Sequence, residues 1–179
     1  PNGFVTLTPR RSEWFSHAGI TPIISSLEWS QSLAIHEYRH MVQYDYFKRD
    51  NLHYGYYLFG ELGQAALMAI SAPKWYFEGE AVWAETALSN AGRGRSPRFS
   101  ARMKALMLNN ELPTYDELLG GVYTTKLPNH YVYGYFLITR AYNIYGKDVW
   151  KEIIAKAAKS PINPYTFYNA FRYVTGKPF

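Results

Sequence analysis

The stretch His36-Glu37-Tyr38-Arg39-His40 brings together side chains that could carry out metal chemistry. In an α-helix, residues four positions apart lie on the same face, one turn apart. The rings of His36 and His40 could therefore reach a single ion at the usual Zn–N distance of about 2.0–2.1 Å. Glu37 lies at the edge of that face, where its carboxylate could take a proton from a metal-bound water. The pattern predicts a catalytic zinc site.

The alternative is a half-buried helix whose two histidines are only hydrogen-bonded core residues. The neighbouring sequence favours the metal interpretation, because another side of this helix carries an apolar stripe at helical spacing. The stripe consists of Ile35, Tyr38, Val42 and Tyr46. We expect the stripe to face the core, which leaves the histidines with Leu33, Glu37 and Tyr44 on the floor of a cleft.

A zinc site of this kind needs a third protein ligand and keeps one position open. The chain has no cysteine, so histidine or a carboxylate must supply that ligand. A third histidine six residues beyond the motif is excluded, because Gln43 and Tyr46 occupy the positions where that spacing requires glycine and histidine. The better candidate is segment 75–85, Trp-Tyr-Phe-Glu-Gly-Glu-Ala-Val-Trp-Ala-Glu.

The two segments together resemble the gluzincin metallopeptidases, whose second zinc helix carries a Trp-x-x-Glu-Gly-x-Ala pattern. The resemblance implies that Glu78 is the third ligand and that Gly79, with no side chain, lets the two helices approach closely. It also implies that Glu85, two turns along the same face, supports the site by orienting a ligand histidine. Glu80 falls nearly opposite on the helix and is expected to face solvent. The alternative for Glu78 is an exposed helix carboxylate.

The chain between His40 and Glu78 is longer than in thermolysin or the aminopeptidases, and we expect the excess, Lys48–Pro73, to be an inserted helix. The resemblance is closest to the peptidase-MA-like domains of secreted bacterial proteins, which also carry a stretch like Gly92–Pro97 after the Glu-Gly helix. It implies a periplasmic or extracellular location. It also implies that a further domain, such as the β-propeller found in several of those proteins, belongs to the full-length chain.

A third feature is the stretch 129–134, Asn-His-Tyr-Val-Tyr-Gly. Gluzincin aminopeptidases carry Tyr-x-x-Gly at the start of a helix beyond the zinc ligands, and Tyr131 matches that tyrosine. The match implies that Tyr131 stabilises the oxyanion, since a phenol donates a hydrogen bond to developing negative charge. Tyr133 and His130 are the other candidates for this role. The alternative is that Tyr131 is one of many core tyrosines.

A basic stretch follows the second motif and contains Arg93, Arg95, Arg98, Arg102 and Lys104. It begins near the start of a helix, where cations are disfavoured, so we expect a solvated structural surface. A second possibility is that one or two of these arginines bind a substrate carboxylate or acids of a neighbouring domain. Arg39 lies off the metal face and is expected to pair with Asp45 or Glu85.

The length of 179 residues suits one domain of ordinary size, residues 1–179, and we expect this domain to be a fragment of a longer protein. Hydrophobic residues make up 47% of the chain and aromatic residues 18%, which is enough for a sizeable core. The net charge of +5 is too small to indicate a dedicated nucleic-acid binder, so we expect no nucleic-acid partner. No apolar run approaches the length of about 20 residues that a transmembrane helix needs.

The expected fold is mainly α (α+β), a zincin-like helical domain of gluzincin type with a small N-terminal β element. Short β runs are predicted at 4–7 and 20–24, and a loop at 48–57. The metal helix should begin between Leu27 and Ser32, capped by Ser26, Ser30 or Ser32, and end near Phe47. Further helices are expected at 60–71, 75–88, 97–109, 115–119, 130–145 and 149–158, with a last one from Asn163 to Gly176.

The predicted function is zinc-dependent hydrolysis of a peptide or protein substrate, with Glu37 as the general base. A catalytically silent zinc-binding or peptide-binding module is one alternative. The intact Glu37 argues against it, because a purely structural metal site has no use for that carboxylate. A basic nucleic-acid-binding domain is the other alternative, and only the stretch 93–104 favours it.

Overall fold

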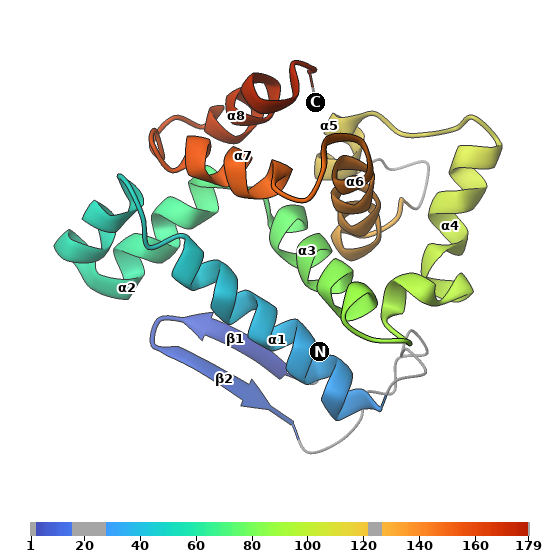
Figure 1. The fold of residues 1–179 in the computed structure, drawn as a ribbon, viewed down its shortest axis with the longest axis horizontal. Coiled ribbons are helices and arrows are strands. Elements are labelled where there is room, and N and C mark those ends of the chain that lie inside the picture. The colour runs from blue at the N-terminus through green and yellow to red at the C-terminus, as the bar shows by residue number, and fades with distance from the viewer. Residues whose placement is uncertain (1–2, 16–27, 122–126, 179) are drawn as a thin grey trace.

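The computed structural model describes residues 3–15, 28–121 and 127–178, which form a helical domain with one β-hairpin (Figure 1). The strands are β1 (Gly3–Leu7) and β2 (Arg10–Trp14), paired antiparallel with Gly3 opposite Trp14. The helices, in chain order, are α1 (Trp29–Tyr46), α2 (Leu52–Ser71), α3 (Lys74–Ala87), the short 3-10 helix η1 (Arg93–Arg95), α4 (Pro97–Leu108), α5 (Tyr115–Gly120), α6 (His130–Tyr145), α7 (Val149–Ala157) and α8 (Thr166–Thr175). The mainly helical fold with a small N-terminal β element is confirmed.

Helix α3 lies at the centre of the domain, where it contacts both α1 and α6 (Figure 1). A cluster of aromatic rings packs at its N-terminal end: the Trp75 ring centroid lies 5.9 Å from that of Trp150 and 5.6 Å from that of Phe167. Aromatic rings bury large apolar areas and prefer such tilted contacts. This packing fixes the start of α3, and with it the position of Glu78.

The close approach that Gly79 permits is to α6 rather than to α1. A Cβ atom on Gly79 would lie 2.3 Å from the backbone carbon of Gly134, and one on Gly134 would lie 2.4 Å from the carbonyl oxygen of Trp75. The two glycines therefore allow backbone-to-backbone contact between α3 and α6. Gly79 was expected to allow close contact between the helix that carries His36 and His40 and the helix that carries Glu78. That expectation is wrong, because the helix that Gly79 contacts is α6.

The β-hairpin lies beside α1 and is tied to α1 and α2 by Arg10 (Figure 1). The Arg10 guanidinium pairs with Asp45 through Nη1 and Oδ1 at 2.6 Å, and its Nη2 donates to the carbonyl of Met41 at 3.1 Å. The Arg10 backbone N–H donates to Glu61 Oε2 at 3.1 Å. The hairpin is thereby held against α1. Strand β2 was not predicted from the sequence, and the β run expected at 20–24 lies outside the described residues.

Helix α2 begins at Leu52, so the loop expected over 48–57 is wrong in its second half. The helix is interrupted at Gly60, whose backbone angles of φ 62° and ψ −148° are open to glycine but strained for other residues. Two helical arms meet there and fold back on each other, since a Cβ atom on Gly63 would lie 2.2 Å from the carbonyl oxygen of Gly55. The inserted helix predicted between the two motifs is present.

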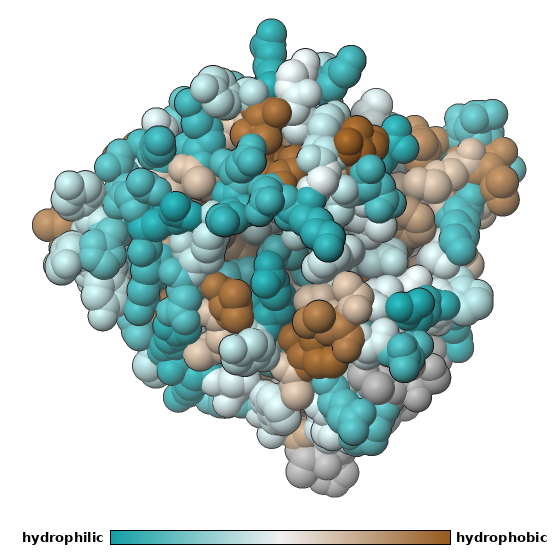
Figure 2. Space-filling model, in the orientation of Figure 1, coloured by the Kyte–Doolittle hydropathy of each residue, from teal (hydrophilic) through white to brown (hydrophobic). Residues whose placement is uncertain are grey.

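The remaining boundaries agree with the sequence within a few residues, but the predicted cap of α1 and the predicted start of α8 differ from the structure. Glu28 caps α1 through its side chain, which accepts from the backbone N–H groups of Ser30 and Gln31, so neither Ser30 nor Ser32 is the cap. Helix α8 begins at Thr166 rather than at Asn163. None of the helices within the described ranges is long and apolar enough to cross a membrane. In the view of Figure 2 the surface is largely hydrophilic, and its hydrophobic side chains lie in separate groups.

Candidate metal centre

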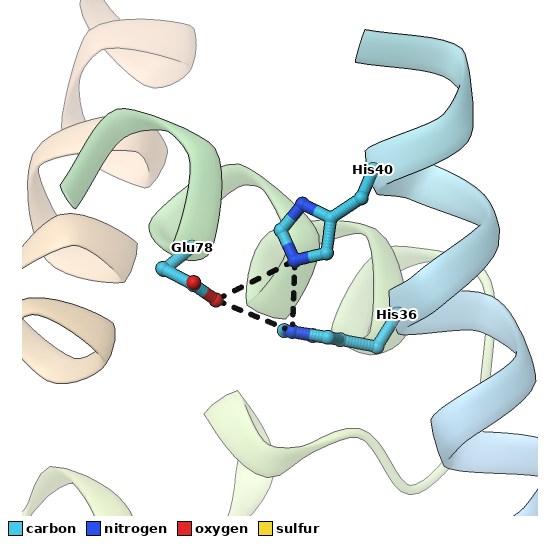
Figure 3. Close-up of side chains that lie close together, drawn as sticks. All are labelled: His36, His40 and Glu78. Carbon is cyan, nitrogen blue, oxygen red and sulfur yellow. Dashed lines mark hydrogen bonds and ion pairs between the residues drawn. The ribbon is translucent and has the colours of Figure 1, made fainter. Parts of the chain in front are cut away.

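His36 and His40 on α1 and Glu78 on α3 point toward one another (Figure 3). The two imidazole Nε2 atoms lie 3.2 Å apart, and Glu78 Oε2 lies 3.4 Å from Nε2 of His36 and 3.5 Å from Nε2 of His40. One potential ligand atom from each residue falls within 4.8 Å of the others, as expected for donors around a common ion. The structure therefore brings together the three side chains proposed from the sequence as metal ligands.

The hydrogen bond at the far nitrogen of His36 determines which of its ring atoms carries the proton. Nδ1 of His36 lies 2.6 Å from Oε1 of Glu85, which is fully buried. Burial disfavours the charged carboxylate, but hydrogen bonds from Arg93 and His36 outweigh it and lower the pKa of Glu85. Nη2 of Arg93 also lies 2.8 Å from this Nδ1, but it donates to Glu85 Oε1 as well. The shorter contact of Nδ1 is to the ionised carboxylate, which only accepts, so we assign Nδ1 as the donor. In the neutral ring, Nε2 then presents a lone pair to the cluster.

His40 is held in the same way by an amide. Its Nδ1 lies 2.8 Å from Oε1 of Gln43, while Nε2 of Gln43 donates to the Phe77 carbonyl at 3.0 Å and to Glu80 at 2.7 Å. Because the amide nitrogen is already donating, the Gln43 oxygen faces His40 and accepts from Nδ1. The neutral His40 ring therefore also presents an Nε2 lone pair to the cluster.

With the protons of both histidines on Nδ1, the three side chains can be compared with the ligands that a metal ion requires. Two lone pairs and a carboxylate oxygen converge at 3.2–3.5 Å, an arrangement that only a cation or added protons can stabilise. Burial opposes ionisation of Glu78, yet the adjoining rings of His36 and His40, when they are protonated, hold its pKa well below the usual range, so the carboxylate is ready as an anionic ligand. Two imidazoles and one carboxylate match the ligand set of catalytic zinc sites. The donor set fits zinc.

Glu37 adjoins the cluster without belonging to the ligand set. Its side chain is buried with 5% exposure, and its Oε2 has no hydrogen-bond partner among the described residues. Burial raises the pKa of Glu37, although both histidines oppose the shift. A buried carboxylate with an unused oxygen and a raised pKa is suited to accept a proton and release it again.

Tyr131, at the start of α6, lines the same cavity as the cluster. Its ring centroid lies 6.1 Å from that of His36, and the Arg93 guanidinium lies 5.4 Å from the Tyr131 ring centroid. Burial and the nearby Glu78 raise the pKa of Tyr131 to about 12, which keeps the phenol a hydrogen-bond donor. Of the other two candidates, Tyr133 is packed in the hydrophobic core, and neither Tyr133 nor His130 lines this cavity.

Four sequence interpretations around the site are wrong. Glu80 is 2% exposed rather than solvent-facing, and Arg39 pairs with Glu80 rather than with Asp45 or Glu85. Arg93 departs from the solvated basic stretch, because it hydrogen-bonds both carboxylate oxygens of Glu85. The other basic residues of the stretch are exposed as expected: Arg95, Arg98, Arg102 and Lys104. The stripe expected to face the core is not buried either: Tyr38 is 70% exposed, and the buried residues of α1 are His36, Glu37, His40 and Gln43.

Gln43, Glu80, Arg39 and Arg93 are the functional candidates that the sequence did not reveal. Gln43 lies one helical turn after His40, and this spacing alone could have indicated the contact. The Glu80 contact could not be found from the helical wheel, because α3 is covered by α1 and by α6 and so has two buried sides.

Comparison of the chain with family models, with curated proteins and with solved structures finds no match.

Proposed function

We propose that this chain is a zinc-dependent metallopeptidase of gluzincin type. The observation that carries the proposal is the convergence of the Nε2 atoms of His36 and His40 with the carboxylate of Glu78, while both Nδ1 atoms are held as donors. The resemblance of the two sequence motifs to the gluzincins supports the same assignment. His36, His40 and Glu78 would hold the ion.

A bound zinc ion would supply Lewis acidity, lowering the pKa of a water and polarising the substrate carbonyl. Glu37 is the general base and general acid: it accepts a proton from the attacking water and passes it to the leaving amine. The burial of Glu37 and its unpaired Oε2 support this role. Tyr131 donates its phenol hydrogen to the oxyanion that forms on the substrate carbonyl.

The surrounding residues keep the two histidines in the required tautomer. Glu85, itself held by Arg93, orients His36, and Gln43, itself held by Glu80, orients His40. Such partners around metal-binding histidines commonly affect metal affinity by 10- to 100-fold. The site therefore has a support for each imidazole, and each support involves a carboxylate of α3, Glu85 for His36 and Glu80 for His40.

The test measures metal content and hydrolysis on the same preparations. We expect one zinc per chain by elemental analysis, and hydrolysis of blocked peptides that chelation abolishes and zinc restores. Glu37→Gln should retain the zinc and lose about 10²- to 10⁴-fold in kcat, the usual contribution of a general base. Glu111→Gln, at an exposed carboxylate away from the cavity, is the matched control and should keep full activity.

Each alternative predicts a different result. A silent zinc-binding module would hold zinc and hydrolyse none of the peptides. A nucleic-acid-binding domain would bind DNA with a salt-dependent affinity and contain no zinc. Full hydrolytic activity in zinc-loaded Glu37→Gln would refute the proposed role of that carboxylate.

A further inference from the structure

A cavity of about 440 Å³ opens beside the metal cluster, within the range of about 300–1,000 Å³ usual for ligand sites. One end of it is polar and is formed by His36, Glu37, His40, Glu78 and Tyr131. The buried Oε2 of Glu37, which has no partner among the described residues, belongs to this lining. The cavity therefore begins at the reactive groups and continues away from them.

The rest of the lining is mainly apolar. The second arm of α2 contributes Ala65, Met68 and Ala69, whose spacing places them on one face of the helix. Ala72, Phe77 and Leu7 extend the apolar wall. Met68, Ala72 and Leu7 are buried, with 4%, 3% and 7% exposure, so this wall is part of the packed domain.

The size and charge of the lining side chains determine which substrate side chains the cavity can bind. Three alanines, Ala65, Ala69 and Ala72, leave room that larger side chains would fill. Among the described lining residues, Lys74 is the one charged side chain apart from Glu37 and Glu78. An apolar group entering this space would lose water-exposed surface favourably, at about 25 cal/mol per Å². A carboxylate would meet the negative charges of Glu37 and Glu78.

We propose that this cavity is the specificity pocket for the substrate, and that it receives an aliphatic or aromatic side chain next to the scissile peptide bond. This inference rests on the proposed function, since the cavity is contiguous with the groups assigned to hydrolysis. The inserted segment α2 supplies a large part of the pocket wall. The insertion between the two motifs thus sets the substrate preference.

The experiment uses the series acetyl-Ala-Ala-X-Ala-Ala-amide, with Gly, Ala, Leu, Phe or Asp at X. Cleavage by the zinc-loaded protein is mapped by mass spectrometry, and binding to zinc-loaded Glu37→Gln is measured by calorimetry. We expect cleavage next to X and a preference for Leu and Phe over Gly of about 10- to 200-fold, the range that a hydrophobic pocket achieves. We expect Asp to be the poorest residue at X.

Two variants narrow the pocket, and one matched control lies on the same helix. Ala65→Leu and Ala69→Leu should lower kcat/KM for the Leu and Phe peptides at least about tenfold while sparing the Gly peptide. Ala66→Leu adds the same side chain at an exposed position that does not line this cavity, and should change neither preference nor activity. Because Ala69 is exposed, its variant remains a test if Ala65→Leu fails to fold.

The possible outcomes distinguish the proposed specificity pocket from the proposed hydrolytic function. Preferential binding of the Leu and Phe peptides by Glu37→Gln, without cleavage by the native protein, would support the pocket and overturn the proposed function. Cleavage with equal efficiency at every X, or a preference unchanged in Ala69→Leu, would overturn the pocket and leave hydrolysis standing. Absence of both binding and cleavage would overturn both.

Discussion

Arg39 on α1 and the buried Glu80 on α3 form an ion pair that connects to His40 of the candidate metal site through one amide. Nη2 of Arg39 hydrogen-bonds Oε1 of Glu80, and the other carboxylate oxygen accepts from Gln43, whose own oxygen faces Nδ1 of His40. Glu80 and the Phe77 carbonyl, which also accepts from Gln43, together hold the orientation of the Gln43 amide. Since that orientation determines which nitrogen of His40 carries the proton, the ion pair influences His40 without contacting it.

The first prediction concerns Glu80→Gln. The substituted amide can turn its NH₂ group toward Gln43, which favours rotation of the Gln43 amide and a His40 ring protonated on Nε2 instead of Nδ1. We expect zinc affinity to fall about 10- to 100-fold, as measured by competition with a chromogenic chelator. Glu152→Gln, an exposed carboxylate on α7, should bind zinc like the native protein. An unchanged affinity in folded Glu80→Gln would contradict the connection.

The second prediction applies to the other imidazole. Glu85→Gln removes the negative charge that faces both Nδ1 of His36 and the Arg93 guanidinium, and leaves that partly buried cation without its carboxylate partner. We expect a loss of zinc affinity of about 10- to 100-fold and a lower free energy of unfolding, because an uncompensated buried charge is costly. Chelator competition and urea unfolding measure the two effects. If zinc affinity stayed constant while stability fell, Glu85 would have a structural role only.

The third prediction separates Tyr131 from its neighbours. Tyr131→Phe deletes the hydroxyl at the cavity, so we expect kcat to fall about 10²- to 10³-fold with KM and zinc content nearly unchanged. Tyr133→Phe removes a hydroxyl from a core tyrosine outside the cavity and is the matched control. Steady-state kinetics on blocked peptides, with metal analysis of each preparation, distinguishes them. Equal kinetics for the two variants would exclude Tyr131 from catalysis.

The fourth prediction concerns the glycine contact that positions α3. Gly79→Ala places a Cβ atom 2.3 Å from the backbone of Gly134, and backbone atoms cannot move aside as a flexible side chain can. We expect a destabilisation of at least about 1–3 kcal/mol, the usual cost of overpacking, measured by urea unfolding. Gly120→Ala is the control, because nothing lies within 4 Å of its added Cβ. Equal stability of the two variants would show that the α3–α6 contact adjusts freely.

Much of this architecture follows from local patterns that act over a few residues. The boundaries predicted for α6, His130 and Tyr145, match the structure because Asn129 caps its start and Gly146 ends it. The spacing of His36 and His40 alone places both rings on one face, since helix geometry is fixed. The proximity of Glu78 was reached by resemblance, because no local rule relates residues so far apart in the chain.

The wrong interpretations share a physical cause, which is that tertiary contacts decide which face of a helix is buried. The apolar character of Tyr38 suggested a core position, yet α1 buries the polar side that carries His36 and His40 and leaves Tyr38 exposed. Glu80 was assigned to solvent because the helical wheel assumes one buried face. Its partners, Arg39 and Gln43, lie on another helix, so the pairing depends on how α1 packs against α3.

The last prediction is that the ligand cluster couples zinc binding to stability. Without an ion, the two Nε2 lone pairs and the Glu78 carboxylate oppose one another, so a bound cation should stabilise the native state far more than the unfolded chain. At a free zinc concentration of 100 times Kd, the gain is about 2.7 kcal/mol. For a domain of this size, that gain corresponds to a rise in Tm of about 5–11 °C.

Thermal melts with and without a chelator measure this shift. His40→Ala removes one ligand and should lose most of it, while Glu37→Gln keeps all three ligands and should retain it in full. This contrast separates metal binding from catalysis, because the two variants are both expected to be inactive. If Glu37→Gln lost the shift as completely as His40→Ala, Glu37 would be a ligand itself, and the division of roles between these residues would be wrong.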